Sequence, residues 1–117
     1  MTLQLHKHQL SAELCRLEFV GKLEMGNEAK QVEWNVSELL VAGVKKVIFD
    51  LSMVDGIDST GVGIIVMCQA KLQKAGGSLR VAGAHGIVQD TLRMTHVDRL
   101  VPMFATAKEA AQDFVAA

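Results

Sequence analysis

Residues 47–63 have the sequence VIFDLSMVDGIDSTGVG and lead from a short apolar run into the start of a helix. The run at 47–49 is rich in β-branched residues, which favours a buried strand. Asp58 or Ser59 is a natural N-cap for the apolar segment 60–75, which we expect to be a largely buried helix. A strand, a loop and a buried helix in this order are typical of α/β proteins.

Outward from this stretch, segments with strand-like and helix-like spacing of apolar residues alternate along the chain. The predicted strands are 3–5, 14–20, 47–49, 79–81 and 101–104, and the predicted helices are 27–42, 60–75, 86–96 and 107–115. The first two strands are expected to form a hairpin that ends at Gly21. The order β-β-α-β-α-β-α-β-α predicts an α/β fold with a mixed, mostly parallel β-sheet and crossover helices.

Length and composition are those of one globular domain. The chain has 117 residues, of which 50% are hydrophobic, and no linker or repeat divides it, so we expect a single domain over residues 1–117. Because 12 basic residues face 13 acidic ones, for a net charge of -1 without any basic cluster, nucleic acid is not an expected partner.

The sequence also bears on the compartment. Cys15 and Cys68 are too few for a disulfide framework and are expected to be free thiols. The N-terminus has no apolar signal core, and the longest apolar stretch, 62–68, is far shorter than the ~20 residues that span a bilayer. We therefore expect a cytoplasmic protein that does not contact the membrane.

Patterns typical of enzymes, cofactor sites and metal sites are not met. Gly61-Val62-Gly63 begins like a dinucleotide fingerprint, but Val66 occupies the place of the third glycine, and no nucleophile-elbow serine is present. His6 and His8 share one side of a predicted strand, and we interpret them as surface residues rather than metal ligands. We expect no enzyme activity, no cofactor and no metal.

The junction before the helix is the candidate functional site. Asp58, Ser59 and Thr60 place a carboxylate and two hydroxyls at a helix N-terminus, where backbone N–H groups and the helix dipole favour an anion. A phosphate on Thr60 would add a charge of about −1.5 to −2 that the helix tolerates and an acidic docking surface would not. Helix capping needs the same residue types, so a purely structural role stays open.

At this point the sequence resembles a known family. Residues 47–63 resemble the core of STAS domains, which are named for sulphate transporters and anti-sigma factor antagonists. In this family a strand ends in Asp-Leu-Ser, and after a short loop Asp-Ser-Ser/Thr-Gly opens a helix. The later segment 74–81, KAGGSLRV, resembles the family's passage from helix through Gly-Gly to strand, and the order of elements agrees along nearly the whole chain.

The resemblance implies a STAS fold and the function of an anti-sigma factor antagonist. Such a protein binds an anti-sigma factor that is also a serine/threonine kinase, which frees a sigma factor for transcription in bacterial signalling. The kinase, which brings ATP and Mg²⁺, phosphorylates the second hydroxyl residue of the motif, and a phosphatase reverses this partner switching. The acceptor falls on Thr60, with Ser59 as the fallback. The implied partner-binding residues are Glu24, Asp58, Ser59, Thr60, Gly61 and Val62. A monomer or weak homodimer is expected.

Two departures from the family and several alternatives remain. Thr60 stands where the best-known members carry Ser, and Gly21-Lys22-Leu23-Glu24 replaces the Gly-x-Leu/Ile-Asp that many members show after the second strand. Alternative functions are a STAS scaffold subunit of a stress-signalling complex, a STAS accessory subunit of a transporter and, last, an enzyme. Trp34 lies off the apolar stripe of its helix and is either an exposed interface anchor or packed under the hairpin.

Overall fold

The computed structural model describes residues 3–26 and 29–116 of the chain. Five strands form one sheet in the order β1-β2-β3-β4-β5. The strands are β1 (Gln4–Gln9), β2 (Leu14–Leu23), β3 (Lys46–Ile57), β4 (Ser78–Ala82) and β5 (Met103–Phe104). β1 and β2 form the expected antiparallel hairpin, and each later neighbour pairs in parallel. The mixed, mostly parallel α/β sheet predicted from the sequence is confirmed.

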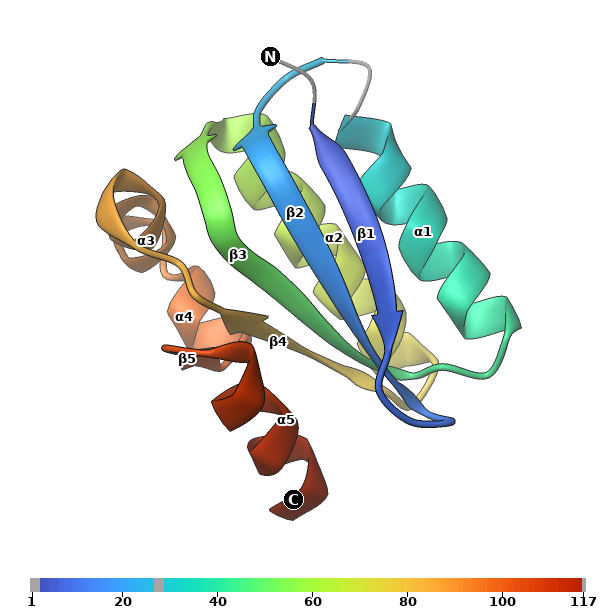
Figure 1. Cartoon of the computed structure of the whole chain (residues 1–117). Helices are drawn as coiled ribbons and strands as arrows, with labels where there is room; N and C mark the ends of the chain where they lie inside the picture. The colour runs from blue at the N-terminus through green and yellow to red at the C-terminus, as the bar shows by residue number, and fades with distance from the viewer. Residues whose placement is uncertain (1–2, 27–28, 117) are drawn as a thin grey trace.

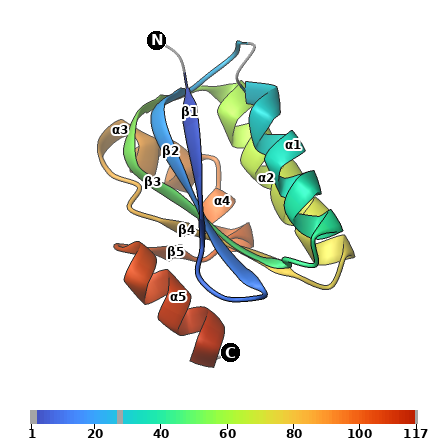
Figure 2. The same cartoon turned by 45° about the vertical axis from the view of Figure 1, so that its right-hand side comes forward.

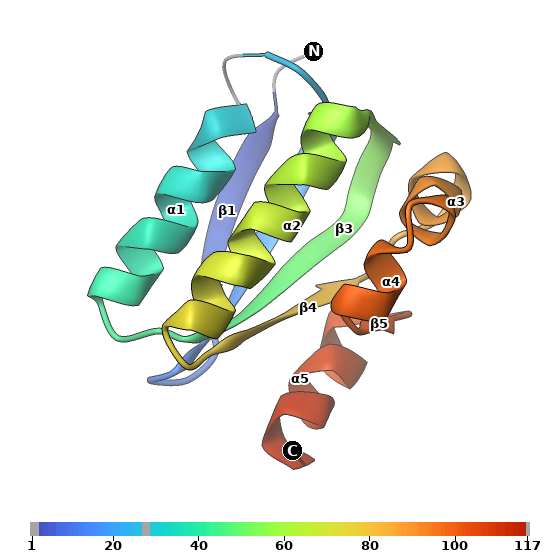
Figure 3. The ribbon, with the colours of Figure 1, turned by 180° about the vertical axis from the view of Figure 1, so that it is seen from behind.

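The helices cover the sheet unevenly (Figures 1 to 3). They are α1 (Ala29–Val41), α2 (Ser59–Lys74), α3 (Gly86–Met94), α4 (Val97–Leu100) and α5 (Ala107–Ala116). α1 and α2 lie side by side across one face, as Figure 3 shows from behind. α5 packs on the opposite face, where Ala110 and Phe114 form a small cluster with Ile48 of β3.

The main core lies between the sheet and helices α1 to α4. Residues of β2 alternate between buried and half-buried positions, as expected for a strand with one face on the core. Phe19 of β2 and Phe49 of β3 have ring centroids 4.9 Å apart and are both fully buried. Val32 and Val36 of α1 are buried in the same cluster, so the apolar stripe predicted for this helix does face the core.

The prediction for the third strand was wrong in length. β3 continues through residues 50–57, which were expected to be a loop, because they pair with the second half of β2, which is itself longer than expected. The register shifts between Glu18 and Val20 and again between Gly21 and Lys22, where Gly21 has φ 118. β2 therefore runs past the expected end at Gly21. Of the polar residues that suggested a loop in β3, Ser52 and Asp55 are exposed, whereas Asp50 is buried.

Other boundaries differ too. The helix expected over 86–96 ends at Met94, because His96 takes a left-handed conformation with φ 63, and α4 follows as a separate turn. The last strand has only two residues. In α2, Met67 is 50% exposed, so the first half of that helix is less buried than predicted. Residues 27 and 28, the expected start of the first helix, lie outside the described residues.

Candidate functional site

The ends of β2 and β3 meet the start of α2 at one edge of the sheet, at the top of Figure 1. Asp58 is the N-cap of α2, with extended backbone (φ -122) as this position requires. Its Oδ1 accepts a hydrogen bond of 3.0 Å from the Gly61 N–H, and its carbonyl accepts the Val62 N–H at 3.0 Å. Asp58 thus starts the helix, as one of the two predicted caps.

The second carboxylate oxygen of Asp58 makes a contact that reaches another element. Oδ2 accepts a hydrogen bond of 2.9 Å from the backbone N–H of Met25, in the segment that follows β2. The Asp58 N–H itself donates to the Leu23 carbonyl over 3.4 Å. One residue therefore connects the segment after β2 to the N-terminus of α2.

These hydrogen bonds favour the charged form of the carboxyl. The bond from the Met25 N–H is the largest influence and holds the pKa of Asp58 below its ordinary 3.8. Partial burial opposes this, and the bond from the Gly61 N–H adds to it. Asp58 is accordingly an anion at neutral pH.

Gly61 is needed for the close approach of α2 to β2. A Cβ at this position would lie 2.1 Å from the Leu23 carbonyl oxygen and 2.8 Å from Cγ1 of Ile57. No side chain fits at those distances without moving backbone. The glycine after the two hydroxyl residues therefore has a structural reason.

The structure brings the predicted site residues to this one edge. Ser59 is exposed, Thr60 and Val62 are half-buried, and Gly61 is buried. Glu24 is exposed at the end of β2, with Oε2 3.0 Å from the place a Cβ on Gly56 would take. Their roles as acceptor and partner contacts stay predictions.

Sequence reasoning missed two residues of this edge. Met25 has an 80% exposed side chain, and its backbone N–H bonds to the Asp58 carboxylate. Asp55 is exposed and forms a 3.5 Å ion pair with Lys22. Met25 lies outside the stretch 47–63, and Asp55 lies in the part of it that was expected to be a loop. Their positions depend on the unexpected length of β2 and β3.

Asp50 of β3 is a buried carboxylate whose hydrogen bonds explain its position. It is 7% exposed, its Oδ1 accepts bonds from the Ser52 hydroxyl (2.7 Å) and N–H (3.0 Å), and its Oδ2 accepts one from Arg16 (2.8 Å). Burial raises the pKa of Asp50, but the bonds from Ser52 and Arg16 outweigh it and hold the pKa below the ordinary value. Asp50 and Ser52 thereby hold the strand at the point where its register shifts.

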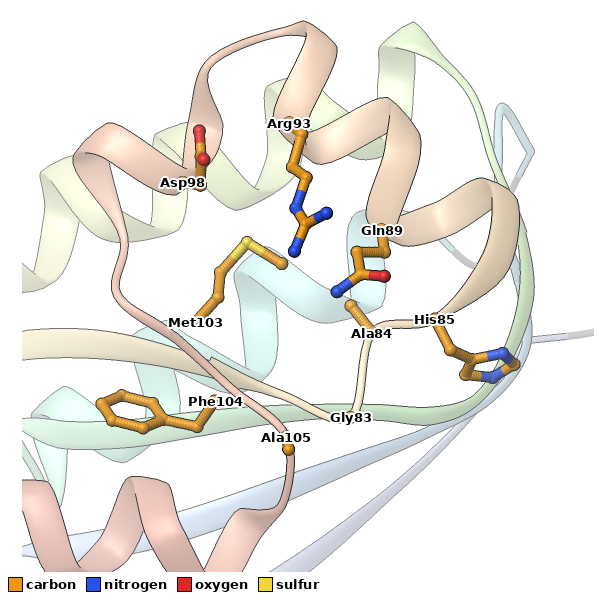
Figure 4. Close-up of a pocket in the computed structure, with 9 residues that line it drawn as sticks. All are labelled: Gly83, Ala84, His85, Gln89, Arg93, Asp98, Met103, Phe104 and Ala105. Carbon is orange, nitrogen blue, oxygen red and sulfur yellow. The ribbon is translucent and has the colours of Figure 1, made fainter.

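A pocket of about 580 Å³ lies beyond the carboxyl ends of β4 and β5 (Figure 4). Gln89 and Arg93, one turn apart on α3, point into it toward Met103, while the ring of His85 points away. His85 instead contacts the Ser52 carbonyl, 3.1 Å from its Nε2. None of the predicted partner-binding residues lines this pocket.

Within residues 3–26 and 29–116, no three His, Cys, Asp or Glu side chains come together as metal ligands. His8 pairs instead with Glu18, 3.1 Å away. Cys15 and Cys68 are free and buried, as free thiols were expected, and burial raises the pKa of Cys68 to about 12. No helix in the described part of the chain is both long and apolar enough to span a membrane.

Comparison with known proteins gives consistent likenesses. The family model described as "STAS domain" matches residues 9–110. A Thermotoga maritima protein provisionally named as an anti-sigma factor antagonist is 31% identical over 81 residues, or 69% of this chain and 72% of that protein. The crystal structure of a provisionally named anti-sigma factor antagonist from this species has a TM-score of 0.84 and 26% identity, covering 93% of this chain and 92% of that one.

The anti-sigma factor antagonist SpoIIAA is similar in fold. Its unphosphorylated form has a TM-score of 0.77 at 18% identity, covering 97% of this chain and 98% of that one. The phosphorylated form of SpoIIAA, from Bacillus, has a TM-score of 0.75 at 17% identity, covering 95% and 99%. The residues matched by the family model include both parts of the candidate site, the end of β2 at Leu23 and the start of α2 up to Val62.

Proposed function

This chain belongs to the STAS domain family, and from that membership we propose that it is an anti-sigma factor antagonist switched by phosphorylation of Thr60. It binds an anti-sigma factor that is also a serine/threonine kinase, and the bound partner releases a sigma factor. The relatives named as anti-sigma factor antagonists support the binding. The whole of residues 1–117 acts as one STAS domain in the cytoplasm and catalyses nothing itself.

The observation that supports this most is the place of Thr60. It lies in the first turn of α2, two residues after an N-cap whose carboxylate is already bonded, at an edge where Ser59 and Glu24 are exposed. A kinase can reach a hydroxyl at the start of a helix without unfolding the core. Ser59, one residue earlier, is the fallback acceptor.

A phosphate here would act on the docking surface. The dipole of a helix N-terminus stabilises an anion, so α2 tolerates the modification. A partner surface that places a carboxylate or an apolar group against the hydroxyls of Ser59 and Thr60 would meet a new charge of about −1.5 to −2. Repulsion and lost hydration would then break the complex, and a phosphatase would restore it.

The experiment is phosphorylation by the partner kinase. The purified chain is incubated with the anti-sigma factor kinase of its own organism and ATP, and the product is mapped by mass spectrometry. We expect one phosphate on Thr60, none on Thr60→Ala, and normal modification of Ser59→Ala. Modification of Thr60→Ala to the wild-type extent would show that Thr60 is not the acceptor.

A second candidate, a scaffold of a signalling assembly, is favoured by one surface. Trp34 is 62% exposed and Val41 is 91% exposed, and with Ser37 and Glu38 they line a hollow on the outer side of α1. The alternative of a tryptophan packed under the hairpin is therefore wrong. Gel filtration with light scattering separates the candidates, because an antagonist elutes as a monomer or weak dimer and a scaffold as a large particle.

A further inference from the structure

The segment after β2 offers an apolar side chain at the proposed docking edge. The side chain of Met25 is 80% exposed, although its backbone N–H is fixed by a hydrogen bond to Asp58. Methionine is flexible and polarizable, so it fits apolar recesses of differing shape. An exposed methionine among polar neighbours is a suitable contact for a partner protein.

The surroundings of Met25 define the charge of the partner. Glu24, Asp55 and Asp58 carry carboxylates at this edge, and the ammonium of Lys22 is already paired with Asp55 at 3.5 Å. A complementary surface is an apolar recess with Lys or Arg on its rim. A phosphate on Thr60 would have to enter the apolar recess, where it loses its hydration without gaining a cationic partner, so the complex would weaken.

The backbone of Met25 is positioned by Asp58. The 2.9 Å bond from the Met25 N–H to Oδ2 and the 3.0 Å bond from the Gly61 N–H to Oδ1 use both oxygens of one carboxylate. The Met25 segment and the first turn of α2 are thereby held together. A carboxylate is required for this, because an amide side chain presents a single oxygen.

Building on the proposed function, we infer that Met25 is the apolar anchor for the anti-sigma factor, and that Asp58 is the positioning residue that fixes this anchor beside Thr60. The expected partner surface is an apolar recess with a cationic rim. Phosphorylation then acts next to the anchor.

The test compares Asp58→Asn with a control, Asp55→Asn, which removes the same charge. Asp55 is exposed, and among the described residues its side chain has no hydrogen bond to the backbone. Asn remains a good N-cap, so α2 should still start at Ser59 in Asp58→Asn. Measured by NMR in the free protein, exchange of the Met25 amide should rise about tenfold in Asp58→Asn, the loss expected for a bond to a charged acceptor, and stay unchanged in Asp55→Asn. Equal Met25 exchange in both variants would overturn the positioning role.

Partner affinity tests the anchor. Calorimetric titration with the kinase of the phosphorylation experiment should show about tenfold weaker binding for Met25→Ala and for Asp58→Asn, relative to Asp55→Asn. Wild-type affinity of Met25→Ala would refute the anchor. If the wild-type chain binds no anti-sigma factor at all, the proposed function fails, whereas the amide exchange still decides the role of Asp58.

Discussion

At the scale of single residues, Asp58 and Gly61 show how the Asp-Ser-Thr-Gly motif holds the start of α2 against the end of β2. Asp58 uses its two oxygens for two segments of chain, and Gly61 lets those segments approach within backbone contact. Between them stand the two hydroxyl residues. Any change to the flanking positions is expected to alter the geometry around Thr60, the proposed acceptor.

Replacing Asp58 separates capping from positioning. Asp58→Ala should lower the free energy of unfolding by about 0.5–2 kcal/mol, because it removes the acceptor for the Gly61 N–H, whereas Asp58→Asn should cost less. Urea denaturation of the two variants measures the difference. Equal losses would mean that the cap bond contributes little.

Gly61 and Gly63 form a matched pair for substitution. Gly61→Ala places a methyl group 2.1 Å from the Leu23 carbonyl oxygen and should destabilise the protein by about 1–3 kcal/mol or more. Gly63→Ala meets no atom within 4 Å and should stabilise α2 by about 0.5–1 kcal/mol. Thermal unfolding of both variants tests this, and similar melting temperatures would contradict the close approach.

The pH dependence of Asp58 has a definite sign. Its pKa in the folded state is lowered, first by the bond from Met25. Its stabilising contribution is therefore fully present above the unfolded pKa of about 3.9 and is lost as the pH falls through the lower, folded value. A carboxyl ¹³C titration should give a pKa below 3.8, and a higher value would contradict the bond.

At the scale of elements, the sequence predicted the type and order of most strands and helices but not all of their lengths. The apolar pattern identified α2 and the run at 47–49, because burial there follows directly from composition. It could not reveal that 50–57 continues β3, since strand length depends on pairing with β2. The division between α3 and α4 was also hidden, because a single left-handed residue, His96, causes it.

This division can be tested at His96. A residue with φ 63 is strained unless it is glycine, so His96→Gly should raise stability by up to about 1 kcal/mol, less the entropy that glycine adds to the unfolded chain. Differential scanning calorimetry measures the change. A clear fall in melting temperature would show that the His96 side chain contributes more than its backbone costs.

At the scale of the whole molecule, the core and the candidate site are separate. The main core lies under α1 to α4, whereas the proposed acceptor lies at the edge where strands end. The sequence located this edge through a single motif, but only the structure added Met25 and Asp55, which come from segments that pairing brings there. A modification at the edge need not disturb the core.

The expected result is a switch in binding without unfolding. Phosphorylation of Thr60 should leave the melting temperature near wild type and weaken the partner complex by a few kcal/mol, where each 1.4 kcal/mol is tenfold. Thr60→Glu should imitate it only in part, since one carboxylate carries less charge. Calorimetry of both proteins, free and with the partner, checks this. A large loss of melting temperature with unchanged affinity would instead make Thr60 part of the buried structure.

The two buried thiols give the molecule its own chemical reporter. Cys15 and Cys68 both have 0% of their surface exposed, and the Cys68 thiol, with a pKa raised to about 12, holds its proton in the native state. Alkylating reagents attack the thiolate, so modification of these two sulfurs should wait for opening of the fold. The rate of that reaction would therefore report the openings that expose these thiols, without a dye or an added label.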